Sequence, residues 1–313
     1  MIIIHKRVEN LKYVFGPVKS RRFGLSLGID LSPEAKSCNF DCLYCELKKR
    51  PPVNSIQKEP SVDQIIEEVE KYLKENSYPD VITVTSNGEP TLFSDLETLV
   101  SSLNLIKGRS KTLILTNGST IYRTDIQKIL KNFDIVKVSI DSVKEKTFKK
   151  IDRPLKGISV SNIVEGLKDF RRIYNGELVI EVMVLEGIND SKEEMSEIAK
   201  VLKDIKPDRI DLGTVDRPPA YNVKPVSDIK LFELSEEFYG FNINVVTRDK
   251  DSILEKRKLT EEQIIKTLKR RPFTYSDIES IFDRETAQKT YAMLKKGILK
   301  TKNVGSVVFV YSD

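Results

Sequence analysis

The sequence is poor in the residues that build disulfide frameworks and membrane spans. Its 313 residues include three cysteines, one histidine and no tryptophan. It has no run of about 18 apolar residues, so no membrane-spanning helix is expected. The N-terminal stretch also lacks the long apolar core and cleavage site of a signal peptide. We therefore expect a cytoplasmic protein without a membrane partner.

Composition and charge limit the possible domain organisation of the chain. With 39% hydrophobic and 32% charged residues, the chain has the make-up of a soluble globular protein: one large domain, or one large and one small. Residues 1–247 carry 37 basic and 37 acidic side chains, whereas residues 248–313 carry 15 and 10. The whole net charge of +5 therefore belongs to the C-terminal stretch.

The three cysteines lie within eight positions, as Cys38, Cys42 and Cys45. This clustering argues against a disulfide framework and favours a reducing compartment and a metal. A loop with gaps of three and then two residues can present three thiolates to an iron–sulfur cluster and leave one iron open. The alternatives are a zinc site completed by His5, and structural cysteines without a metal.

Apolar strand patterns alternate with amphipathic helical patterns through most of the chain. This alternation predicts parallel strands joined by right-handed crossovers, in an open doubly wound sheet or in a full or partial barrel. Both arrangements place ligands at the C-terminal ends of the strands. The predicted strands are 23–30, 81–86, 111–117, 134–141, 177–187, 209–215 and 243–247, and the clearest helices are 61–76 and 191–205.

The character of the chain changes after residue 247. Residues 248–258 are polar and charged and are interpreted as a linker between a domain of residues 1–247 and one of residues 259–313. The latter shows three short helical patterns, the third over 284–296, and then two strand patterns around Asn303 and Gly305. This order predicts a small winged helix-turn-helix domain. Three binding partners of this small domain are considered: nucleic acid, a protein or peptide, and the main domain itself.

The cysteine motif, with Tyr44 before its last cysteine, resembles that of the radical S-adenosylmethionine (radical SAM) superfamily. The resemblance implies a partial (β/α)6 TIM-type barrel over about residues 20–245. It implies a [4Fe–4S] cluster on Cys38, Cys42 and Cys45 whose open iron is chelated by S-adenosyl-L-methionine. Reductive cleavage of this cofactor gives methionine and a 5'-deoxyadenosyl radical that removes hydrogen from a substrate. The segment before the cysteines also resembles an iron–sulfur oxidoreductase branch distantly related to the wyosine-base synthase of transfer RNA.

Other segments at strand ends are similar to the family's cofactor-binding motifs. The resemblance assigns "SNGEPTL" (86–92) to the methionine amino group, "VSID" (138–141) to the ribose or carboxylate, and, more weakly, "TNG" (116–118) and "LGTVDRPP" (212–219) to cofactor or substrate. The cofactor-binding residues expected on this basis are Tyr44, Gly88, Glu89, Asn117, Ser139, Asp141 and Thr214. Turn formation is the competing interpretation of "NGEP" and "TNG".

The resulting functional hypothesis is an enzyme with one cluster, because no cysteine is left for a second cluster or for methyl transfer. Its substrate is unidentified and is a small molecule, an RNA or a peptide. An electron donor such as ferredoxin or flavodoxin is expected as a partner. No catalytic acid or base is assigned, although Asp141, Glu181 and Asp211 are candidates by position. The alternative function is a DNA-binding regulator that senses redox state through the cluster.

Overall fold

The fold is described from a computed structural model covering residues 11–20, 22–246, 258–270, 272–275, 278–279, 282–304 and 307–313. An eight-stranded sheet has its strands in chain order, with β2 to β8 mutually parallel and β1 antiparallel to β2. The strands are β1 (Val14–Ser20), β2 (Gly24–Asp30), β3 (Val81–Thr85), β4 (Lys111–Thr116), β5 (Ile135–Ser139), β6 (Glu177–Val184), β7 (Arg209–Thr214) and β8 (Ile243–Val245).

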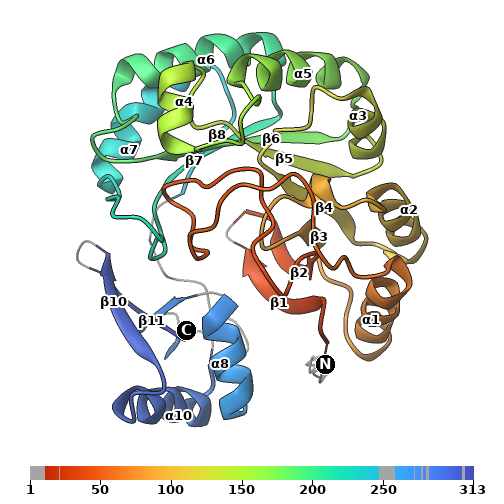
Figure 1. The fold of residues 1–313 in the computed structure, drawn as a ribbon, viewed down its shortest axis with the longest axis vertical. Helices are drawn as coiled ribbons and strands as arrows, with labels where there is room; N and C mark the ends of the chain where they lie inside the picture. Colours follow the sequence, from red (N-terminus) through yellow and green to blue (C-terminus); the bar gives the residue numbers. More distant parts are fainter. Residues whose placement is uncertain are drawn as a thin grey trace.

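Helices cover the convex side of this curved sheet (Figure 1). They are α1 (Val62–Glu75), α2 (Leu96–Ile106), α3 (Thr124–Leu130), α4 (Glu145–Ile151), α5 (Val160–Ile173), α6 (Lys192–Ile205) and α7 (Asp228–Ser235), with short 3-10 helices at Pro90–Leu92 and Glu236–Phe238. Helix α1 shows why such segments are helical: Ser61 and Gln64 form a capping box, and Ile65, Val69 and Tyr72 recur on the buried face.

Alternate residues of the strands face two different environments. Ile82, Ile114 and Val136 belong to the large core between the sheet and the helices. Their neighbours of opposite parity form a smaller apolar group on the concave side, made of Val81, Leu113, Ile135 and Val179 with Phe23 and Leu115. β1 and β8 end the sheet and do not pair with each other in the described residues, so the barrel is partial. The α/β class and the partial barrel are thus confirmed.

The C-terminal region, residues 258–313, has a core of its own. It comprises α8 (Glu261–Arg270), β9 (Phe273–Thr274), α10 (Arg284–Lys295), β10 (Lys300–Val304) and β11 (Val307–Tyr311), with the strands in the antiparallel order β10-β11-β9. Asn303 lies in β10 opposite Val308 rather than in a turn, and Gly305 lies outside the described residues, as does the proposed linker up to residue 257. The winged-helix assignment stays a prediction.

The C-terminal region contacts the barrel through its hairpin of β10 and β11. Lys302 Nζ donates to the carbonyl oxygen of Pro219 at 2.7 Å. Phe309 is 4% exposed and packs in an apolar cluster with Ile151, Leu185 and Val215, which lie near the C-terminal ends of α4, β6 and β7. The hairpin therefore covers part of the barrel rim. No helix in the described part of the chain is both long enough and apolar enough to cross a membrane.

Candidate functional site

The loop that carries the cysteines follows β2 and is tied down on three sides. Ser37 bridges to Gly88 after β3, the amide of Leu43 donates to Ile151 O at 2.8 Å, and the amide of Ala220 donates to Cys45 O at 2.8 Å. These partners come from the ends of β3, α4 and β7. Backbone hydrogen bonds, rather than cysteine side chains, therefore hold the loop over the C-terminal ends of the strands.

Gly88 is the point of closest approach between this loop and the barrel. A Cβ atom at position 88 would lie 1.7 Å from Ser37 O and 2.3 Å from its carbonyl carbon. The backbone of Ser37 is held against residues 87–89 by two hydrogen bonds. Ser37 N donates to Asn87 O at 2.8 Å, and Glu89 N donates to Ser37 O at 2.9 Å. Glycine permits this close approach because it has no Cβ, and the approaching backbone is that of the cysteine loop.

The three thiols are free and half-buried. Burial raises the pKa of Cys38 to about 12, and it raises the pKa values of Cys42 and Cys45 as well. The thiols are therefore neutral at pH 7 unless a cationic centre stabilises the thiolates. Three free thiols on one anchored loop are the donor set that an iron–sulfur cluster with one open iron requires.

The zinc alternative gains no support from the described residues. Among them, no three His, Cys, Asp or Glu side chains are grouped so as to hold a single metal ion. His5, which was to complete that site, lies outside them. A four-iron cluster differs from zinc in taking each thiolate at a separate iron, so it needs no such convergence.

Glu89 is buried and heavily hydrogen-bonded. Its Oε1 accepts from Thr91 N, Thr91 Oγ1 and Thr116 Oγ1, whereas Oε2 accepts from Asn117 N at 2.7 Å. Burial raises the pKa of this carboxyl, although the hydrogen bonds lower it in part. Oε2 has the greater remaining capacity to accept a hydrogen bond.

Asn117 connects this carboxyl to the cysteine loop. Its Nδ2 donates to Asn39 Oδ1 at 2.8 Å and lies 3.7 Å from Cys38 Sγ. Its Oδ1 accepts from Ser119 N at 2.9 Å, so the amide has a fixed orientation. The end of β4 is thereby brought directly to the sulfur of a candidate cluster ligand.

Asp141 and Tyr44 come together beside the end of β5. Ser139 ends β5, and Asp141 Oδ1 accepts from Met183 N at 2.7 Å. Burial raises the pKa of Asp141 to about 7, and the Tyr44 and Asp152 side chains lie against it. Asp141 Oδ2 is buried without a hydrogen-bond partner of normal geometry in the described residues. A buried carboxyl with one oxygen incompletely satisfied, beside the cysteine loop, fits a site that receives a polar group from a cofactor.

Thr214 is placed differently from the other predicted residues, because its hydroxyl is already engaged. Its Oγ1 donates to Val184 O at 2.7 Å and accepts from Val226 N at 2.9 Å. It therefore fixes the start and end of the loop over residues 215–226. The same loop is held to the cysteine loop by a hydrogen bond from Tyr221 Oη to Asp41 and by Arg217, which lies 2.8 Å from Glu46.

Sequence reasoning named Glu181 and Asp211 as candidates by position but missed Lys137, which pairs with Glu181 on the concave side of the sheet. Lys137 Nζ lies 2.6 Å from Glu181 Oε1, and Arg22 binds the same carboxylate. Burial alone would raise the pKa of Glu181, but the two cations lower it to about 2. Asp211 is paired with Arg209 at 2.9 Å. A charged residue in a strand that is otherwise apolar, such as Lys137 in "IVKVS", was the available signal.

The sequence comparisons agree with this arrangement. A family model described as "Radical SAM superfamily" matches residues 35–213. A "UPF0026 protein" from Helicobacter pylori strain J99 is 38% identical over 305 residues, which is 96% of this chain and 98% of that protein. A Brachyspira hyodysenteriae protein named "GTPase Obg" is also 38% identical, over 91% of this chain but 42% of its own length. More than half of that protein has no counterpart here.

Solved structures with a similar fold share little sequence with this chain. Streptococcus suis SuiB bound to the precursor peptide SuiA has a TM-score of 0.58 at 18% identity, covering 72% of this chain and 49% of that one. TYW1 with a lysine-pyruvate adduct bound has a TM-score of 0.51 at 15% identity, covering 74% of this chain and 76% of that one. At these identities the likeness concerns the fold alone.

Proposed function

Because this chain belongs to the radical SAM superfamily, we propose that it is an enzyme that uses a [4Fe–4S] cluster to cleave S-adenosyl-L-methionine reductively. When bound, the cluster and cofactor supply a 5'-deoxyadenosyl radical that abstracts hydrogen from a substrate not yet identified. The observation that carries the proposal is the anchoring of the cysteine loop against Gly88 and Glu89 through Ser37, the residue before Cys38. This geometry supports a cluster and a cofactor amino group at neighbouring positions.

We assign the roles of this chain's residues as follows. The three thiolates hold the cluster, and Glu89 Oε2 accepts a hydrogen bond from the methionine ammonium. Ser139 and Asp141 bind the ribose or the carboxylate, which would satisfy the buried Asp141 Oδ2. Gly88 and Thr214 act through the backbone they position.

The substrate is proposed to enter on the concave side of the sheet. Lys137 and Glu181 line that side beneath Ser139, since residues 135, 137 and 139 share strand parity. The loops over residues 31–60 and 215–226 meet above it, as Ala220 and Tyr221 bond to the cysteine loop. Loops that cover the concave side in this way keep water away from a radical, which would otherwise react with the wrong bond.

The direct test is product analysis on protein reconstituted with iron and sulfide without oxygen. After reduction, the protein should convert S-adenosyl-L-methionine to methionine and 5'-deoxyadenosine. Cys42→Ala should make neither product. If the reduced native protein makes neither, even with a cell extract supplying substrate, the proposal is wrong.

A further inference from the structure

A strongly basic surface lies next to the cysteine loop. Residues 47–50 and 144–159 contain nine basic and two acidic side chains, and one of the acids, Asp152, is buried. Basic side chains exceed acidic ones by seven in these two stretches, and Glu193 beside Lys144 and Asp41 beside Arg153 offset part of this excess. We call this the basic surface, and its members are Lys48, Lys49, Arg50, Lys144, Lys146, Lys149, Lys150, Arg153 and Lys156.

The two halves of the basic surface are joined in space through one aromatic ring. Lys49 Nζ lies 4.3 Å from the centroid of Tyr221, and Arg153 Cζ lies 4.4 Å from the same centroid. Arg153 also pairs with Asp41 at 3.6 Å, within the cysteine loop. Charges that are about a hundred residues apart in sequence therefore form one continuous surface.

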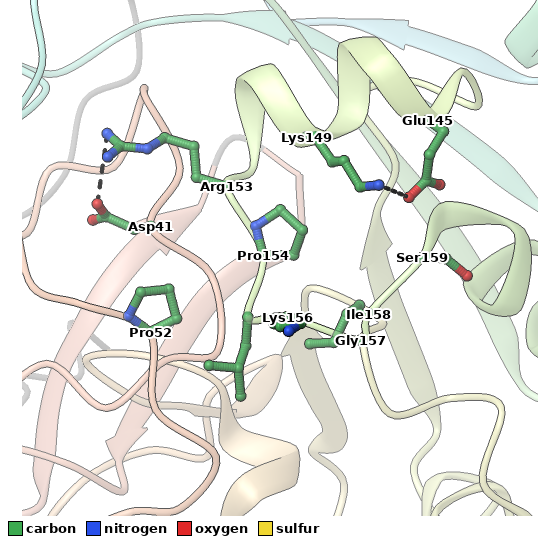
Figure 2. Close-up of a pocket in the computed structure, with 11 residues that line it drawn as sticks. Asp41, Pro52, Glu145, Lys149, Arg153, Pro154, Lys156, Gly157, Ile158 and Ser159 are labelled. Carbon is green, nitrogen blue, oxygen red and sulfur yellow. Dashed lines mark ion pairs between the residues drawn. The ribbon is translucent and has the colours of Figure 1, made fainter.

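The surface is hollowed where α4 meets the cysteine loop. A cavity of about 480 Å³ is lined by Asp41 and Pro52 on one side and by Lys149, Arg153 and Lys156 on the other. Figure 2 shows Arg153 reaching from the end of α4 to Asp41, with Lys149 held by Glu145 at the far rim. Lys146 and Lys150 follow the exposed face of α4, opposite the buried Phe148.

This surface approaches the cysteines from outside the barrel. Leu43 N bonds to Ile151 O, and Cys42 Sγ lies 3.3 Å from Asp152 Oδ1, so one stretch of backbone separates the basic side chains from a cluster ligand. The substrate side is the concave face with Lys137 and Ser139. A partner on the basic surface is therefore close to the cysteines that would hold the cluster, while it leaves the concave face free.

We propose that the basic surface docks an acidic one-electron carrier protein. The inference rests on the proposed function, which requires one electron for each cleavage. The carrier is oxidised by one electron and the cluster is reduced by one, and no atoms are transferred. Complementary charge favours this partner, since opposite potentials speed encounter and orient the two proteins. The positive charge would also favour a nucleic acid. A nucleic acid substrate, however, would have to react on the concave side, away from this surface.

The test measures the rate of cluster reduction in the reconstituted full-length protein. Flavodoxin in its reduced form serves as the acidic carrier, and dithionite serves as a small reductant that needs no docking surface. The triple variant Lys146→Glu/Lys150→Glu/Lys156→Glu should be reduced at least tenfold more slowly by flavodoxin at low salt, but at the native rate by dithionite. Raising the salt concentration should slow the native protein towards the variant.

The matched control reverses three exposed lysines on other helices, Lys128→Glu/Lys131→Glu/Lys203→Glu, and should keep the native rate with flavodoxin. An unchanged flavodoxin rate in the first variant, or an equal loss in the control, overturns the docking proposal. So does loss of transfer RNA binding in the first variant without any loss of flavodoxin-driven reduction. Failure of the proposed function looks different: a cluster reduced by dithionite would then leave S-adenosyl-L-methionine intact.

Discussion

Single residues set unequal environments for the three sulfur atoms. Cys38 Sγ accepts from Phe40 N at 3.4 Å and lies 3.7 Å from Asn117 Nδ2. Cys42 Sγ instead faces the carboxyl of Asp152. Hydrogen bonds to the sulfurs raise the reduction potential of an iron–sulfur cluster, because they stabilise its more negative state. Asn117 is thus placed to ease reduction from the Cys38 side.

Asn117→Ala should make the midpoint potential of the cluster more negative. Loss of one hydrogen bond of about 1.4 kcal/mol corresponds to about tenfold in the reduction equilibrium, or about 59 mV for one electron. The measurement is a redox titration followed by electron paramagnetic resonance. Ser119→Ala is the control, because it removes the hydrogen bond to Asn39 and leaves the amide of Asn117 in place. An unshifted potential in Asn117→Ala would contradict this role.

Gly88→Ala should prevent the cysteine loop from seating against β3. The new methyl group would collide with Ser37 O, so the loop carrying Cys38 must move. We expect iron content after reconstitution to fall severalfold while the barrel still folds, as judged by circular dichroism. Gly240→Ala is the control: nothing lies within 4 Å of a Cβ at that position, so its φ of +90° introduces backbone strain without a collision, and iron loading should stay native. Full iron loading in Gly88→Ala would refute the steric argument.

Residue types and spacing predicted part of this site and missed the rest for a physical reason. Glu89 and Asn117 could be selected as candidates because each lies in a loop that follows a strand. The engagement of the Thr214 hydroxyl by Val184 and Val226 could not be found, since it depends on the path of a loop. Lys137 and Glu181 are 44 positions apart, so only the lateral pairing of β5 with β6 brings them together.

At the scale of elements, apolar runs located the strands β2 to β8, because parallel strands covered by helices are apolar over most of their length. The first strand escaped this pattern. β1 contains Gly16 and Pro17, and its register with β2 shifts between Phe15 and Val18. Proline has no amide hydrogen to donate to a sheet and breaks the alternation by which a strand is recognised.

The cross-strand pairing of β5 with β6 should be sensitive to loss of Glu181. Glu181→Gln leaves Lys137 and Arg22 without their shared carboxylate in a buried site, and breaking such a pair costs about 3–5 kcal/mol. Urea unfolding at pH 7 measures this loss. Glu165→Gln, which removes an exposed pair with Lys168, should change the free energy of unfolding by less than about 1 kcal/mol. Equal effects of the two substitutions would contradict the assignment.

The same carboxylate gives the protein a defined acid sensitivity. The folded pKa of Glu181 is about 2, below its ordinary value of 4.5. Its contribution to stability is therefore complete above pH 4.5 and is lost as the pH falls towards 2. Unfolding free energies of the native protein should fall across this window more steeply than those of Glu181→Gln. Parallel curves for the two proteins would show that Glu181 has no such role.

At the scale of the whole molecule, Phe309 and Lys302 hold the C-terminal region to the barrel among the residues described, and Phe309 is the buried one of the two. Phe309→Ala should cost about 3–5 kcal/mol and separate the unfolding of the two parts into two calorimetric transitions. Phe232→Ala, at a position 54% exposed on α7, should leave the native transition nearly unchanged. A native-like transition in Phe309→Ala would mean that other contacts couple the two parts.

The central claim is that the three thiolates leave one iron open to S-adenosyl-L-methionine. Electron paramagnetic resonance of the reduced, reconstituted protein tests it most directly, with and without that cofactor. We expect a four-iron signal whose line shape changes when the cofactor is added, and loss of this change in Glu89→Gln. A signal that stays the same when the cofactor is added, or protein that binds zinc in place of iron, would show that no iron is open to the cofactor.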